Sequence, residues 1–63
     1  MVLIYGGDCY IRDAPNTSGK KYGVAKKGTK FDYAGETSAN GWNKIVYKRN
    51  ELWVSGKYSK LVD

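Results

Sequence analysis

The chain has 63 residues, which is enough for one small domain and too few for two. Its composition, 41% hydrophobic and 27% charged, is typical of a folded domain and excludes a disordered segment. Eleven Lys and Arg against six Asp and Glu give a net charge of +5, and the lack of His, with a single Cys, excludes a Ser–His or Cys–His pair and a Cys/His zinc site. We therefore expect a basic binding domain with no catalytic residues, metal or cofactor.

The amino-terminal part of the chain predicts a β-hairpin. Residues 2–5 form an apolar run that is far too short to cross a membrane or to serve as a signal peptide, so they predict a strand. Two glycines and Asp8 follow as a turn, and residues 9–12 predict a second strand. Because side chains alternate between the two faces of a strand, Cys9 and Ile11 are expected to be buried together.

The next part predicts a long loop followed by two short strands. Residues 13–21 are polar and contain a Pro and a Gly, which indicates an exposed loop and a first place to look for ligand contacts. A short apolar segment at 22–25 ends at the turn 26–28, where Gly28 allows a positive φ. Residues 30–35 then predict one strand, with Phe31 in the core.

The carboxy-terminal part begins with a second polar loop at 36–41, whose closing Asn-Gly is a strong turn signal. Residues 42–48 predict a strand that places Trp42 and Tyr47 on opposite faces, so that one of the two is expected to be exposed. The remaining elements are expected to be a turn at 48–51, a strand at 52–54, one helical or 3₁₀ turn at 55–58 and a closing strand at 61–62.

Taken together, these elements predict an all-β fold. No stretch sustains the apolar spacing of an amphipathic helix, whereas short strand-like runs recur about every ten residues. Five or six short strands without a crossover helix favour a small antiparallel barrel formed by residues 1–63, since closure removes exposed sheet edges. Its core is expected to include Ile11, Phe31, Ile45 and Val54.

Four motifs add a family resemblance to this reading. In chain order they are Tyr10-Ile11-Arg12-Asp13-Ala14-Pro15, Lys26-Lys27-Gly28-Thr29-Lys30, Asn40-Gly41-Trp42 and Trp53-Val54-Ser55-Gly56-Lys57-Tyr58. Their order and spacing over residues 2–62 resemble the bacterial SH3-type (SH3b) domain of cell-wall hydrolases and phage endolysins. The chain departs from the family pattern at Gly19, Leu52 and Asp13-Ala14.

The resemblance implies an SH3-like barrel that is not itself catalytic. Such a domain would bind the peptide part of peptidoglycan, or its cross-bridge, and tether a lytic enzyme to its substrate. We accordingly expect a module of a longer protein, for instance a bacterial autolysin or phage endolysin, that acts outside the cell at the wall. Neither a cofactor nor a membrane is expected to take part.

Six residues are candidates for ligand contact. Trp53 and Tyr58 match family positions that line a shallow groove beside the long loop, although each could instead complete the thin core. Tyr10 and Trp42 are further aromatic candidates, with a solvated strand face and a core edge as their alternatives. Asp13 and Asn16 could bind amides or an amine of a wall peptide, or could simply shape their loop. Arg12 is expected to form a structural ion pair or a hydrogen bond to the loop, whose carbonyl groups need donors.

Two other functions remain compatible with the composition. Small basic barrels with surface aromatics also bind nucleic acid, through phosphate contacts and base stacking. A peptide-binding adaptor is the other alternative, but the six acidic residues are scattered along the chain. Dispersed lysines could add electrostatic attraction to anionic wall polymers. The motif order favours the cell wall over nucleic acid.

Overall fold

A computed structural model describes all residues, 1–63, and contains strands, turns and loops. No helix is long and apolar enough to cross a membrane. The all-β prediction is confirmed, but the number of strands is eight rather than five or six. The strands are β1 (Val2–Ile4), β2 (Cys9–Arg12), β3 (Lys21–Ala25), β4 (Lys30–Phe31), β5 (Tyr33–Thr37), β6 (Asn43–Tyr47), β7 (Asn50–Val54) and β8 (Ser59–Leu61).

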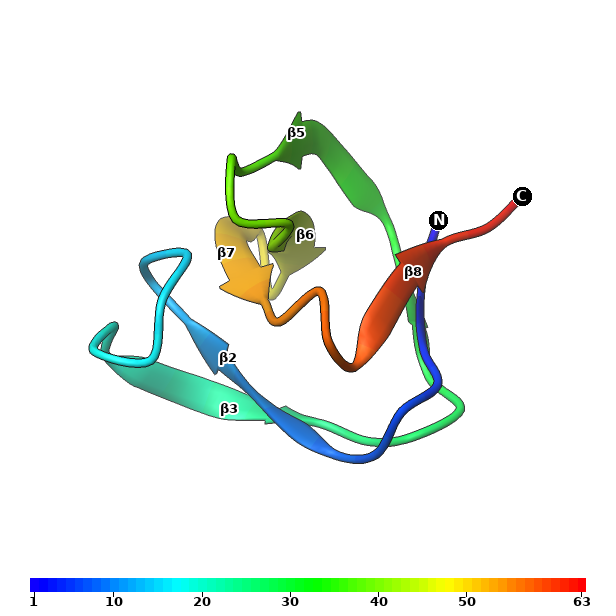
Figure 1. Ribbon diagram of the computed structural model, residues 1–63, viewed down its shortest axis with the longest axis horizontal. Coiled ribbons are helices and arrows are strands. Elements are labelled where there is room, and N and C mark those ends of the chain that lie inside the picture. Colours follow the sequence, from blue (N-terminus) through cyan, green and yellow to red (C-terminus); the bar gives the residue numbers. More distant parts are fainter.

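The strands form two antiparallel sheets that pack into a small SH3-like fold. One sheet has the order β4-β1-β8 and the other the order β3-β2-β7-β6-β5. Figure 1 shows the β2–β3 hairpin on one side, with β5, β6 and β7 above it and β8 beside the amino-terminal strand. The two ends of the chain lie together, since Val62 N donates to Met1 O at 2.8 Å.

The core lies between the two sheets and is built almost entirely from aliphatic side chains. Ile11, Ile45 and Val54 are fully buried, as the alternation along their strands predicts. The complete buried cluster is Val2, Ile4, Ile11, Ala25, Ile45, Leu52 and Val54. Phe31 is only partly buried and packs against this cluster, with its ring edge-on to Tyr47 at a centroid distance of 6.2 Å. The prediction placed Phe31 in the core, and the structure places it at the core's edge, packed against the buried cluster.

The single strand expected at residues 30–35 is split between the sheets. β4 pairs with β1, whereas β5 pairs with β6, and the change occurs at Asp32, whose carbonyl oxygen accepts a hydrogen bond from Val46 N at 3.0 Å. Gly35 has a φ of 88° within an irregularity of the β5–β6 pairing. The alternation of side chains gave no sign of this change, because both halves are rich in strand-forming residues.

Two further predictions fail in the β6–β7 hairpin. The turn contains only Lys48 and Arg49, with φ values of 49° and 68°, so that Asn50 and Glu51 belong to β7. These φ values suit a two-residue hairpin turn, but Lys-Arg lacks the Asn or Gly that usually marks one. Trp42 is buried and Tyr47 half-buried, so neither aromatic is exposed.

Candidate ligand-binding groove

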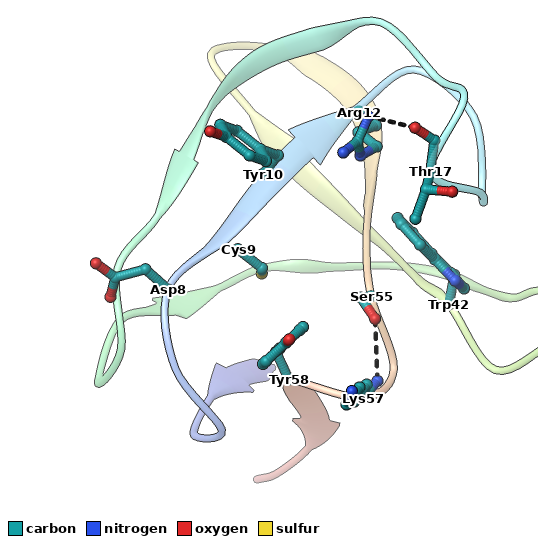
Figure 2. A pocket seen from close by; sticks show the side chains of 9 residues that line it. All are labelled: Asp8, Cys9, Tyr10, Arg12, Thr17, Trp42, Ser55, Lys57 and Tyr58. Carbon is teal, nitrogen blue, oxygen red and sulfur yellow. Dashed lines mark hydrogen bonds between the residues drawn. The ribbon is translucent and has the colours of Figure 1, made fainter.

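A groove of about 370 Å³ is hollowed between β2, the two polar loops and the turn that follows β7. Figure 2 shows the side chains of these separate segments around the groove. The groove is lined by Asp8, Cys9, Tyr10, Arg12, Thr17, Trp42, Ser55, Lys57 and Tyr58. The turn before β2 contributes Asp8, β2 itself contributes the next three, and the long loop contributes Thr17. Trp42 and the turn at 55–58 contribute the others, so segments from both halves of the chain build one site.

Arg12 holds the long loop, residues 13–20, in place at one end of the groove. Its Nη1 atom donates hydrogen bonds to the carbonyl oxygens of Thr17 at 2.7 Å and Gly19 at 2.9 Å. These bonds confirm the expected role of Arg12 in binding loop carbonyl groups. Because the guanidinium is always charged and offers several donors, one side chain can fix two points of the loop.

The departures from the family pattern in this loop are neighbours in space. A Cβ atom on Gly19 would lie 3.0 Å from Ala14 N and 3.1 Å from Arg12 Cβ, so the close approach of the two sides of the loop favours glycine. The Asp13 carboxylate accepts a hydrogen bond from Lys20 N at 2.8 Å, which closes the base of the loop. Gly19 and Asp13-Ala14 thus suit one another in a compact loop.

Residues 38–42 form the second loop and position Trp42. Ser38 N donates to Trp42 O at 2.8 Å, and Trp42 N donates to Ser38 Oγ at 3.0 Å, so the loop is closed around the tryptophan backbone. Asn40 Nδ2 donates to Pro15 O at 2.9 Å and joins this loop to the long loop. The indole, only 9% exposed, is therefore held at the rim of the groove between two tethered loops.

The remaining wall is the turn at 55–58, which a buried polar network supports from below. Tyr58 N donates to Ser55 O at 3.2 Å, which closes one turn as the sequence predicted. Ser59 Oγ donates to the same carbonyl at 2.7 Å and accepts a hydrogen bond from the buried Asn43 Nδ2 at 3.1 Å. Since Asn43 Oδ1 also accepts from Thr37 Oγ1, every buried polar atom of this network has a partner.

The structure brings three of the six candidate residues together and places the other three elsewhere. Tyr10, Trp42 and Tyr58 all line the groove, and whether each contacts a ligand stays a prediction. Asp13 and Asn16 do not line it. The Asp13 carboxylate binds Lys20 N, and Asn16 Oδ1 accepts a hydrogen bond from Ser18 N at 2.9 Å. Both side chains shape the loop, which is the alternative that the sequence left open.

Trp53 also lies outside the groove. It is 8% exposed and faces away from the core cluster, to which its neighbours Leu52 and Val54 belong. The Lys44 ammonium covers it at 5.2 Å from the ring centroid. The expectation that Trp53 lines the groove was wrong, although Trp53 is paired with the groove residue Arg12 across β7 and β2 and therefore lies on the same face of the sheet.

Sequence reasoning overlooked several lining residues, among them Asp8, Thr17 and Lys57. Lys57 belongs to the same sequence motif as the candidate Tyr58, so that motif could have indicated it. Asp8 gave no such signal, because it occupies a turn. Its Oδ1 accepts a hydrogen bond from Lys27 N at 2.8 Å, and its Oδ2 lies 3.4 Å from Lys26 Nζ.

Two pKa values in the groove are displaced in opposite directions. The backbone N–H of Lys27, with a smaller contribution from Lys26, holds the pKa of Asp8 below its ordinary value of 3.8. Burial raises the pKa of the Cys9 thiol, so this side chain is not a reactive thiolate at neutral pH. Cys9 packs against the core cluster and behaves as a small apolar residue.

Asp8 is expected to make the stability of the domain depend on acid pH. Because its pKa is lower in the folded chain than in the unfolded one, its stabilising contribution is complete above the ordinary pKa and is lost as pH falls through the lower value. Asp8→Asn should therefore lower the melting temperature less at about pH 2.5 than at neutral pH. Thermal unfolding of both proteins at the two pH values checks this, and an equal deficit at both would contradict it.

Comparison with known proteins assigns a family to this architecture. The sequence model of the family described as bacterial SH3 domain matches residues 7–60, from the turn before β2 into β8. Searches of the curated proteins and of the solved structures found no significant match. Bacterial SH3 domains are small binding modules for peptide or cell-wall ligands and are generally not catalytic. The family model matches most of the chain, and the fold consists of two antiparallel sheets. The chain therefore belongs to the bacterial SH3 domain family.

Proposed function

We propose that this domain binds the peptide part of peptidoglycan and tethers a lytic enzyme to the bacterial cell wall. In this proposal the domain is one module of a longer protein that acts outside the cell. The observation that carries it is the groove, in which Tyr10, Trp42 and Tyr58 converge between two loops that are tied to each other. Family membership supports a peptide or cell-wall ligand.

The dimensions and chemistry of the groove suit a short peptide. Its volume of about 370 Å³ lies near the lower end of the range for small-ligand sites, about 300–1,000 Å³. Aromatic side chains offer a large contact area at low entropic cost, and tyrosine adds a hydroxyl group for amide hydrogen bonds. Since the two loops and the turn are fixed by internal hydrogen bonds, little ordering is needed when a ligand binds.

Tethering would act through effective concentration. A catalytic domain linked to a wall-bound module stays close to insoluble substrate, and its own chemistry need not change. The net charge of +5 would add a long-range attraction to anionic wall polymers, which salt weakens. Groove recognition and charge attraction therefore differ in their dependence on salt.

A sedimentation experiment tests the proposal. The purified domain should co-sediment with peptidoglycan stripped of its anionic polymers, at low salt and at about 1 M salt, where charges are screened within about 3 Å. It should release no soluble wall fragments, and single-stranded DNA should bind only at low salt. Binding to stripped wall and to DNA that disappears equally at high salt would contradict the proposal and indicate a general affinity for polyanions.

A further inference from the structure

The groove is lined by more cations than anions, and only the cations are free to pair with a charged ligand. Arg12 and Lys57 line it as cations, and Asp8 is the single acidic lining residue. The Asp8 carboxylate is already bound by Lys27 N and by the Lys26 ammonium, and Figure 2 shows its side chain directed away from the other lining residues. Neither lining cation forms an ion pair with an acidic residue. The groove therefore presents uncompensated positive charge.

Cations also accompany two of the three groove aromatics. Lys21 Nζ lies 4.2 Å from the centroid of the Tyr10 ring, and the Arg12 guanidinium carbon lies 5.4 Å from it. Lys57 Nζ lies 5.7 Å from the centroid of the Tyr58 ring. The negative faces of these rings are thus partly satisfied by the protein's own cations. A cationic ligand group would compete with them and would be repelled by them.

Donors remain free for an anionic group. Arg12 uses Nη1 alone for its two bonds to the long loop, so Nε and Nη2 of the guanidinium are not bonded to protein acceptors. The Lys57 ammonium contacts the Tyr58 ring but no acceptor, and only its backbone N–H is used, in a bond to Ser55 Oγ. Asp13, which directly follows β2, lies outside the groove and binds Lys20 N.

We propose that the groove selects peptides that carry a carboxylate beside the bound segment and discriminates against peptides that carry an amine there. The proposal rests on the proposed function, since it names the charge class of the peptide bound at the same site. Arg12 and Lys57 would determine this specificity. A hydrogen bond between a carboxylate and a cationic donor is stronger than one between neutral groups, whereas an amine would meet only the committed carboxylate of Asp8.

Three peptides that differ only in their terminal charge test this selectivity. They are N-acetyl Gly-Ala-Gly-Ala-Gly with a free carboxylate, the same peptide as its amide, and the unacetylated amide with a free amine. The carboxylate peptide should bind about tenfold more tightly than the neutral one, and the amine peptide more weakly than both, as measured by NMR titration at low salt.

The outcomes separate the two proposals. Equal affinity for the three peptides, or a preference for the amine, would overturn the charge selectivity and leave peptide binding in the groove intact. If none of the three binds, peptide recognition by the groove fails and the selectivity fails with it.

A charge reversal identifies the residues responsible. Lys57→Glu should abolish the preference for the carboxylate peptide over the amine peptide. The matched variant is Lys30→Glu, which makes the same change in net charge at an exposed residue that does not line the groove, and it should preserve the preference. If both variants reduce the preference equally, net charge rather than the groove is responsible, and the assignment to Lys57 is overturned.

Discussion

Gly56→Ala is expected to destabilise the domain by about 3 kcal/mol, roughly the upper end of the cost of overpacking a tight contact. A Cβ atom at residue 56 would lie 2.8 Å from the carbonyl carbon of Gly41 and closer still to its oxygen. Both contacts are with backbone, so no side-chain rotation relieves them, and the second loop would have to move away from the turn. At about 0.05–0.15 kcal/mol per residue, a domain of this size has only a few kcal/mol of stability to lose.

The control for this variant is Gly28→Ala. Gly28 has a φ of 92°, but no atom lies within 4 Å of the position that its Cβ would take, so only backbone strain of about 1 kcal/mol is expected. Urea unfolding followed by tryptophan fluorescence measures both effects. A smaller loss of stability for Gly56→Ala than for Gly28→Ala would show that the close approach of turn and loop does not support the fold.

Tyr10→Ala is expected to weaken binding to stripped peptidoglycan by about tenfold or more, which corresponds to about 1.4 kcal/mol or more. The side chain is 46% exposed and lines the groove, so its removal deletes contact area without opening a cavity in the core. The fold should persist, because the fully buried cluster does not include this residue.

Tyr22→Ala is the matched control. Tyr22 lies on the neighbouring strand β3, is 49% exposed and has the Lys20 ammonium 5.4 Å from its ring centroid, but it does not line the groove. Its removal should leave wall binding unchanged. Co-sedimentation at increasing amounts of peptidoglycan gives both affinities. An equal loss in the two variants would mean that surface aromatics act without regard to the groove.

The sequence predicted the parts of the fold that depend on local pattern. Residues 9–12 form β2 with the expected bounds, and Ile11, Ile45 and Val54 are buried because period-two alternation determines which side chains face the core. The change of sheet at Asp32 could not be predicted in this way. It depends on which partner strand each half of the segment meets, β1 or β6, and that is a property of the closed fold.

The residues that line the groove could likewise be predicted only in part from local sequence pattern. The motifs contain Tyr10, Trp42 and Tyr58, which line the groove, but a motif does not show which of its side chains reach the groove. Trp53 precedes the turn by only two residues and is paired with Arg12, yet it lies beneath Lys44 and does not line the groove. Asp8 reaches the groove through folding of a turn that carries no distinctive sequence pattern.

Loop residues were the hardest to assign. Asp and Asn form hydrogen bonds with nearby backbone N–H groups so readily that their presence beside Pro gives little evidence of ligand contact. Here the side chains of Asp13 and Asn16 are both used in this way. The side chain that organises the loop is instead Arg12, at the end of the preceding strand.

The central claim, that wall peptide binds in this groove, is tested most directly by the two tryptophan indole N–H signals in an NMR titration with soluble peptidoglycan fragments. Trp42 lines the groove, whereas Trp53 lies beneath Lys44 and does not line it, so each domain carries its own control. We predict that the Trp42 signal shifts progressively and saturates while the Trp53 signal stays in place. A shift of Trp53 without one of Trp42, or no shift of either at saturating fragment, would contradict it.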